Sequence, residues 1–392
     1  MAADGLRRIG LVDAGSPGWT AGSAFVRTLA SSLAAAAEGS EIEVAVLSAR
    51  LDGAGGQARL VPLLPRRQLP GEARLRELAR RPPGLSPIRT ARTHGVSVLV
   101  LPFFVPRWTG GVAVIGWIPD FQHLRLPELF GDEERRCRDA EYRALAGRAD
   151  LVLLSSRSVA ADFAAFAPEH SAKARVLPFP SRFAFETVTA SNPPARQRFT
   201  LPPKFALVVG QLWRHKNHQL VLDALRALRA RDVTVPVVVA GLPADYRDPT
   251  NTVLSRLLQT IAEVPLRDQV TVLGLVSEAN LLDLLRTAAV VIQPSRFEGW
   301  STVVQDAQAL GRPVLCSDIA VHREQAPAAL GFFNPDRPDA LAELLAATWD
   351  GLPPGPDAAA EEAALAKERR FARDHGERLL ALCREAYETH RG

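Results

Sequence analysis

The first half of the chain alternates short apolar runs with stretches of helical periodicity. Each run is bounded by turn residues, which is typical of buried parallel strands, and strand–helix alternation predicts a parallel α/β sheet. An alanine-rich segment, Thr20 to Ala37, is predicted as a helix. The predicted strands of this half are Arg8 to Val12, Ile42 to Leu47, Val98 to Leu101, Val112 to Trp117 and Leu151 to Leu154.

The same alternation restarts after residue 204 and predicts a second parallel sheet. The predicted strands are Phe205 to Val209, Val235 to Ala240, Val270 to Leu273, Val290 to Gln293 and Pro313 to Cys316. The predicted helices are His218 to Arg229, Thr252 to Ala262, Glu278 to Thr287 and Thr302 to Leu310. Open parallel sheets bind ligands beyond the carboxyl ends of their strands, so two such sheets imply a cleft between two domains.

Two breaks in the pattern divide the chain. Residues 186–204 are polar and proline-rich without periodicity, which predicts an interdomain linker. Residues 351–357 (GLPPGPD) break the chain again, and charged helical sequence follows. We therefore expect an α/β fold with an N-terminal domain over 1–190, a C-terminal domain over 200–350, and helices over 356–392 that pack back towards the first domain.

Length and composition agree with two globular domains. A chain of 392 residues exceeds the ~250–300 residues at which single cores stop growing. No apolar run approaches the ~18 residues of a membrane span, and no secretory signal is visible, so we expect a cytoplasmic protein. Three cysteines lie far apart and form no CxxC pair, which fits a reducing compartment. The formal charge of +4 suits phosphate ligands or an anionic membrane surface without proving either.

The segment from Gln293 to Arg323 (QPSRFEGWSTVVQDAQALGRPVLCSDIAVHR) carries the strongest functional signal. A strand ends, a loop follows, and a helix begins near Thr302, which with Gln305 matches a capping box. The amides of Gly299, Trp300 and Ser301 then lie at a helix N-terminus, which attracts phosphates and sugar hydroxyls. Glu298 before the helix and Asp306 one turn inside it can accept hydrogen bonds from vicinal hydroxyls, whereas Gln305 points elsewhere.

This segment resembles the glutamate-x7-glutamate region of retaining glycosyltransferases of the GT4 type, also called glycosyl transferases group 1, which have the GT-B fold. The resemblance implies two Rossmann-like domains facing a cleft. It assigns Glu298 to the donor sugar, the amides that follow to sugar and phosphate, and Asp306 to the ribose. Asp306 departs from the family pattern, because it is one methylene shorter than the glutamate usually found there.

A second segment, Phe205 to Leu222, reads as strand, glycine turn at Gly210, basic cluster and helix. The family keeps two basic residues here that touch the diphosphate, and Lys216 matches one of them. Gln211 stands where the other often lies, so we assign that role to Arg214. Fixed cations aimed at a departing diphosphate lower the barrier to transfer. The chain contains no Asp-x-Asp motif, so no metal is implied.

Two loops of the first half also resemble the family. In WIPDFQHLRLPELF (117–130), Pro119 replaces a histidine that usually precedes the aspartate, so Asp120 and His123 are candidates for contacts with the acceptor or the transferred sugar. In GSPGWTAG (15–22), Gly15 and Gly18 would let the backbone approach the diphosphate. His123 is equally well explained as a hydrogen-bonded core residue.

Residues 66–92 contain an excess of arginine over acidic side chains. A solvated helix face explains this excess, and docking on anionic lipid is the alternative, at about 1 kcal/mol per arginine near the surface.

The resemblance implies a metal-independent hexosyltransferase that retains the anomeric configuration. The expected donor is a nucleotide-diphosphate sugar such as GDP-mannose or UDP-glucose, which is a substrate and not a cofactor. The expected acceptor is a glycan or a lipid-linked molecule, as in polysaccharide biosynthesis, and no nucleic acid is implied. Two alternatives stay open: a sugar-nucleotide epimerase with a similar fold, and a degenerate partner subunit that binds nucleotide sugar without transfer.

Overall fold

A computed structural model describes residues 5–13, 20–48, 58–62, 86–102, 105, 109–185, 192–263 and 266–392. By backbone contacts it divides into two compact units. The first contains residues 1–121, 136–185 and 370–392, and the second contains residues 122–135 and 186–369. Segments far apart in sequence therefore share a unit. The domain ranges expected from the sequence are contiguous, and they stay predictions.

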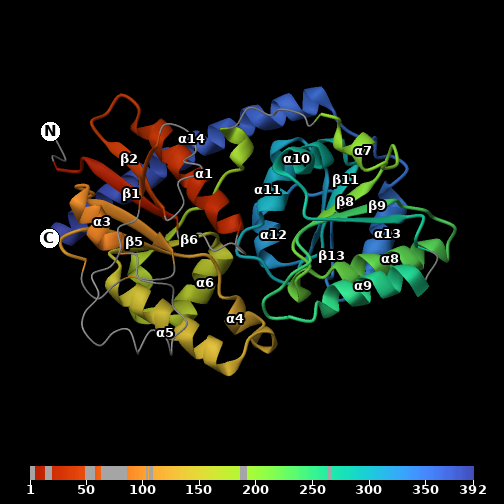
Figure 1. The fold of residues 1–392 in the computed structure, drawn as a ribbon, viewed down its shortest axis with the longest axis horizontal. Coiled ribbons are helices and arrows are strands. Elements are labelled where there is room, and N and C mark those ends of the chain that lie inside the picture. The colour runs from red at the N-terminus through yellow and green to blue at the C-terminus, as the bar shows by residue number, and fades with distance from the viewer. Residues whose placement is uncertain are drawn as a thin grey trace. The chain divides into compact units, whose positions relative to one another are not determined.

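The first unit is built on a parallel sheet with the order β3-β2-β1-β4-β5-β6-β7 (Figure 1). Helices α1 (Thr20–Ala37), α3 (Pro87–Thr93), α5 (Asp132–Arg148) and α6 (Arg157–Phe166) join the strands. The strands are β1 (Arg8–Asp13), β2 (Glu43–Ser48), β3 (Arg59–Pro62), β4 (Val98–Pro102), β5 (Ala113–Ile118), β6 (Leu151–Leu154) and β7 (Ala174–Val176). The central strands β4, β5 and β6 are fully buried, which explains their continuous apolar sequences.

The second unit carries a parallel sheet with the order β10-β9-β8-β11-β12-β13. Its strands are β8 (Ala206–Val209), β9 (Val237–Ala240), β10 (Val270–Gly274), β11 (Val290–Gln293), β12 (Val314–Ser317) and β13 (Gly331–Phe333). Its helices are α4 (Gln122–Arg125), α7 (Ala195–Arg198), α8 (His218–Arg229), α9 (Thr252–Glu263), α10 (Glu278–Thr287), α11 (Thr302–Ala309), α12 (Ala320–Gln325) and α13 (Pro338–Thr348).

Two groups of helices surround this second sheet. Helix α8 packs against α9 and α13, and α10 packs against α7 and α11 (Figure 1). Strands β8 and β9 and helix α8 share one apolar core with α13. The two sheets with interleaved helices confirm the expected α/β fold of two Rossmann-like domains.

The structure differs from the expected secondary structure in two respects. The sequence analysis missed β3, β7 and β13, which have three or four residues each. The expected linker is partly helical, because α7 lies within it. It also packs on the second unit, where the Ala195 amide donates to Asp283 Oδ2 on α10. Residues 186–191 of that linker lie outside the described residues.

A single long helix, α14 (Ala358–Arg391), forms the C-terminal part of the chain. Its residues from Arg370 onwards belong to the first unit. There His375 shares a hydrogen bond of 2.9 Å with Ser32 of α1, and Glu385 pairs with Arg175. The residues of α14 from Arg370 onwards therefore pack within the first unit, and they belong to one helix where the sequence analysis expected several.

Two glycines of the second unit bring the ends of neighbouring strands together. Gly210 follows β8 and Gly241 follows β9. A Cβ at Gly241 would lie 1.8 Å from the carbonyl oxygen of Gly210, which no side chain can tolerate. The close approach fixes the start of the loop that leads to Lys216.

Gly241→Ala should therefore destabilise the second unit by about 3 kcal/mol, because the backbone must shift to admit the methyl group. Urea unfolding followed by tryptophan fluorescence measures this change. Gly131→Ala is the matched control, since a Cβ there meets no atom within 4 Å. Equal unfolding midpoints for the two variants would show that the loops are not packed as described.

Candidate functional site

The second sheet reverses its strand order between β8 and β11. Loops that follow two such strands diverge to opposite sides, so they leave a crevice at the carboxyl ends where ligands of α/β proteins bind. The loop after β8 carries Lys216, and the loop after β11 carries Glu298. The two segments with the strongest sequence signals thus meet at the switch point of the sheet.

Lys216 and Glu298 form a direct ion pair at this point. Nζ of Lys216 lies 2.7 Å from Oε1 of Glu298. The side chains are largely buried, with 18% of Lys216 and 8% of Glu298 exposed. Lys216 ends the 3-10 turn η4 (Arg214–Lys216), and Asn217 follows in the left-handed region with φ 58°. The turn and this reversal aim the lysine back across the end of the sheet.

Neutral donors complete the environment of Glu298. Gln293 Nε2 donates to Oε1 at 2.8 Å, and Ser295 Oγ donates to the same oxygen at 2.7 Å. The described residues donate no hydrogen bond to Oε2. Glu298 is therefore held through one oxygen, and the other can accept a hydrogen bond from a ligand.

The electrostatics of this cluster keep Glu298 ionised. Burial by itself would raise the pKa of the Glu298 carboxyl, but the charge and hydrogen bond of Lys216 outweigh burial and hold the pKa below its usual value. His322 and Ser295 lower this pKa further. A charge this deeply buried persists only because it is paired.

His322 on α12 lies within this electrostatic network. Its Nδ1 is 3.0 Å from the carbonyl oxygen of Ser317, which requires a proton on Nδ1. Burial lowers the pKa of His322 despite the opposing effect of Glu298, so the ring is neutral near neutral pH. Sequence analysis did not single out His322, Gln293 or Ser295, although all three lie in the segment it selected.

The start of α11 differs from the sequence-based prediction. Ser301 is the N-cap, because its Oγ accepts from the Val304 amide at 3.3 Å. Thr302 is instead the first helical residue, so the predicted Thr302–Gln305 capping box is wrong. Gln305 points away from the helix start, as expected, and donates to both carboxyl oxygens of Glu368 at 3.0 Å.

One of the expected ligand-binding amides is already occupied. The amide of Ser301 donates to Gln325 Oε1 at 3.1 Å. Gly299 is buried and Trp300 is partly buried beside it. Donor contacts at Gly299, Trp300 and Thr302 stay predictions. So does the ribose contact of Asp306, which is half-buried in the second turn of α11.

Among the other candidates, Arg214 lies in the same unit but does not join the Lys216–Glu298 cluster. Arg214 is exposed and lines a different pocket. Asp120 is half-buried in the first unit after β5, and His123 is buried in α4 of the second unit. Gly15 and Gly18 lie outside the described residues. The roles of these residues in binding or catalysis stay predictions.

The basic stretch is only partly described. Residues 66–85 lie outside the described residues, and Arg89 and Arg92 are exposed on α3. No helix in the described part of the chain is long and apolar enough to cross a membrane. Within the same residues, no group of three or more His, Cys, Asp or Glu side chains is arranged to hold a metal ion.

Lys216→Met should reduce the free energy of unfolding by about 3 kcal/mol at pH 7, because it leaves a buried carboxylate unpaired. In the wild type, the pKa of Glu298 in the folded protein lies below its value of about 4.5 in the unfolded chain. The stabilisation of the folded protein by the ionised Glu298 is therefore complete above pH 4.5, and it is lost as the pH falls through the folded pKa. The cost of Lys216→Met should therefore shrink in acid. Urea unfolding at pH 7 and pH 4 checks this.

The matched variant is Lys216→Met combined with Glu298→Gln, which removes the unpaired charge and should recover part of the lost stability at pH 7. A single variant whose destabilisation did not change with pH would contradict the buried ion pair.

Comparisons with known proteins agree with this geometry. Residues 192–350 match the family model described as glycosyl transferases group 1. The chain is 27% identical over 131 residues to mannosylfructose-phosphate synthase of Agrobacterium fabrum, a match over 33% of this chain and 29% of that protein. It is 26% identical over 324 residues to D-inositol 3-phosphate glycosyltransferase of Arthrobacter sp. strain FB24, covering 75% of this chain and 73% of that protein.

The first of these matches spans less than a third of the length of the curated relative. A crystal structure of the Anabaena protein HepE in complex with UDP and glucose superimposes with a TM-score of 0.62 at 15% identity, over 96% of this chain and 98% of HepE. At that identity the likeness shows the fold alone. The matched family model identifies residues 192–350 as a glycosyl transferases group 1 domain, and the two parallel sheets with interleaved helices have the GT-B fold of two Rossmann-like domains.

Proposed function

We propose that this protein transfers a hexosyl group from a nucleotide-diphosphate sugar to a glycan or lipid-linked acceptor, with retention of anomeric configuration and without a metal ion. The observation that carries the proposal is the buried Lys216–Glu298 pair at the switch point of the second sheet. The family match over residues 192–350 supports transfer over the epimerase and binding-subunit alternatives. HepE, whose structure contains UDP and glucose, supports a uridine nucleotide donor.

The ion pair can serve both halves of such a donor. An ammonium group has three N–H donors, and Lys216 uses one for Glu298. Two donors remain for diphosphate oxygens. Oε2 of Glu298 can accept from a sugar hydroxyl, since the bonds of its carboxylate converge on Oε1. The pair therefore joins the sugar subsite to the phosphate subsite across one buried hydrogen bond.

The charge of Lys216 is placed to act during bond cleavage. As the bond between the anomeric carbon and the phosphate oxygen breaks, the diphosphate gains negative charge and the sugar becomes oxocarbenium-like. A cation held by the protein stabilises that charge without reorganising at the moment of reaction. The acceptor oxygen then bonds to the anomeric carbon on the same face, and its proton passes to the departing phosphate.

Lys216→Ala and Glu298→Ala should each reduce kcat/KM for transfer by about 100- to 1,000-fold, the usual effect of losing one preorganised electrostatic contact. Release of UDP or GDP from UDP-glucose or GDP-mannose, in the presence of a glycan acceptor, measures the rate. Lys367→Ala and Glu343→Gln are matched controls, because both side chains are exposed on helices outside the Lys216–Glu298 cluster. Full activity in both site variants would refute the proposal.

The same assay separates the alternatives. An epimerase would convert the donor without an acceptor. A degenerate subunit would bind nucleotide, with a raised unfolding temperature, but release none of its sugar.

The product should have the anomeric configuration of the donor, and transfer should continue in excess EDTA. Proton NMR of the anomeric region of the product identifies the configuration, because the new glycosidic bond does not mutarotate. Inversion would exclude the same-face route. Loss of activity in EDTA that returned with a divalent cation would show that Lys216 does not replace a metal.

A further inference from the structure

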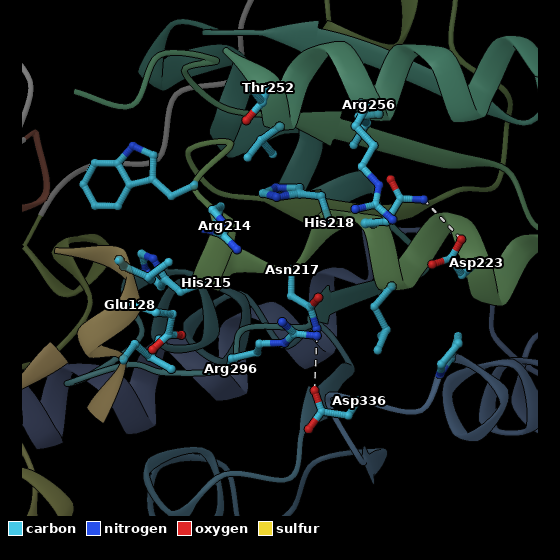
Figure 2. Close-up of a pocket in the computed structure, with 18 residues that line it drawn as sticks. Glu128, Arg214, His215, Asn217, His218, Asp223, Thr252, Arg256, Arg296 and Asp336 are labelled. Atoms are coloured by element: carbon cyan, nitrogen blue, oxygen red, sulfur yellow. Dashed lines mark hydrogen bonds and ion pairs between the residues drawn. The ribbon is translucent and has the colours of Figure 1, made fainter. Parts of the chain in front are cut away.

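A second pocket lies in the same unit and does not include the Lys216–Glu298 pair. It has a volume of about 560 Å³, which is large enough for a small sugar derivative. Turn η4, the N-terminal parts of α8 and α9, and the loop before α13 contribute to its lining (Figure 2). Neither Lys216 nor Glu298 is among the lining residues.

Three arginines line this pocket: Arg214 on η4, Arg256 on α9 and Arg296 after β11. Arg296 pairs with Asp336, with Nη2 3.1 Å from Oδ1. Arg214 and Arg256 have neither an ion-pair nor a hydrogen-bond partner among the residues that the structure describes. Two guanidinium groups at the pocket thus keep all their donors for a ligand, and the planar guanidinium matches phosphate oxygens.

The N-terminus of α8 adds positive potential to the pocket. Asn217 precedes the helix, but its side chain makes no cap hydrogen bond; its Nδ2 donates to the carbonyl oxygens of Pro294 and Pro335 at 3.2 and 2.8 Å. The first amides of a helix have no intrahelical acceptor. The uncapped start of a 12-residue helix therefore faces the pocket that Asn217, His218 and Gln219 line.

Two buried histidines supply an independent sign of a missing ligand. His215 is 4% exposed and His218 is 3% exposed, and both line the pocket (Figure 2). Nδ1 of each ring has no hydrogen-bond partner within the described parts of the chain. Buried polar atoms are nearly always satisfied in folded proteins, so these two atoms point to a polar group that occupies the pocket.

Both rings are neutral near neutral pH. Burial, aided by the charge of Lys216, lowers the pKa of His218 to about 4 and that of His215 well below its usual value. They can therefore each donate one hydrogen bond or accept one, without adding charge.

Acidic and amide side chains lie in the same pocket as the cations. Asp223 and Gln219 on α8 are linked by a hydrogen bond of 3.1 Å, and Glu128 lies in the 3-10 turn Pro127–Leu129 that follows α4. Carboxylates accept hydrogen bonds from hydroxyl groups and repel free anions. A pocket with both kinds of group suits a ligand that has a phosphate at one end and hydroxyls at the other.

We propose that this pocket binds a phosphorylated sugar or polyol, with its phosphate monoester at Arg214, Arg256 and the α8 N-terminus and its hydroxyls at Asp223 and Glu128. This site is separate from the donor site. Turn η4 connects the two sites, because Arg214 at one end of the turn lines the pocket and Lys216 at the other end pairs with Glu298. Occupancy of the pocket would then hold the turn that carries Lys216.

Isothermal titration calorimetry of the full chain with glucose 6-phosphate, inorganic phosphate and glucose tests the proposal, with saturating UDP present to fill the donor site. Glucose 6-phosphate should bind, and Arg256→Gln should weaken it about tenfold, the effect of one lost charge-assisted contact. Arg231→Gln is the matched control, because this exposed arginine lies beyond the other end of α8. It should leave the affinity unchanged.

Asp223→Asn should lower the affinity for glucose 6-phosphate but leave the affinity for inorganic phosphate unchanged. Equal affinity of wild type and Arg256→Gln, or no heat with glucose 6-phosphate at millimolar concentration, would overturn the proposal. Equal affinities for inorganic phosphate and glucose 6-phosphate would contradict the proposed contacts between the pocket and the sugar hydroxyls. Competition with UDP would place the phosphate in the donor site instead.

The same titrations on Lys216→Ala distinguish this proposal from the proposed function. Lys216→Ala should lower the affinity for UDP and leave the affinity for glucose 6-phosphate unchanged. If the transferase proposal is wrong, the wild type will show no UDP binding and no sugar transfer, but its second pocket will still bind glucose 6-phosphate.

Discussion

The ion pair between Lys216 and Glu298 is the interaction on which the organisation of the second unit's functional end depends. A buried carboxylate is costly unless a cation and hydrogen-bond donors compensate for it, and here Lys216, Gln293 and Ser295 all converge on one oxygen. The pair is not required for a stable core, since the apolar cluster beneath it supplies that. Its placement at the switch point indicates a role in ligand binding instead.

The backbone around this pair explains why two charged groups can be held so closely. Gly241 lets the loop after β9 approach the loop after β8, and Asn217 adopts a left-handed conformation that reverses the chain after Lys216. Asn217 also anchors the turn by donating from Nδ2 to two carbonyl oxygens, and its side chain makes no hydrogen bond that caps α8. One asparagine thereby fixes the lysine and leaves the helix start open towards the second pocket.

The two sites differ in the way their charges are compensated. At the switch point, positive and negative groups neutralise each other before any ligand arrives, and a ligand has to share them. In the second pocket, no residue that the structure describes pairs with Arg214 or Arg256, and three nitrogens of His215 and His218 are buried without a partner among those same residues. The first arrangement suits a reaction in which charge develops and disappears, whereas the second suits stable binding of an anion.

The sequence by itself determined the two parallel sheets, most of their strands and the two loops that form the ion pair. Buried central strands require continuous apolar runs, so their positions can be read directly, whereas the edge strands β3, β7 and β13 are only partly buried and lack such a run. Tertiary structure decided which hydroxyl residue caps α11, because Ser301 and Thr302 differ there only in backbone conformation and contacts. It also decided that Arg214 leaves the Lys216 cluster and that His322 joins the network of Glu298, since contacts between distant segments depend on how the strands are ordered in the sheet.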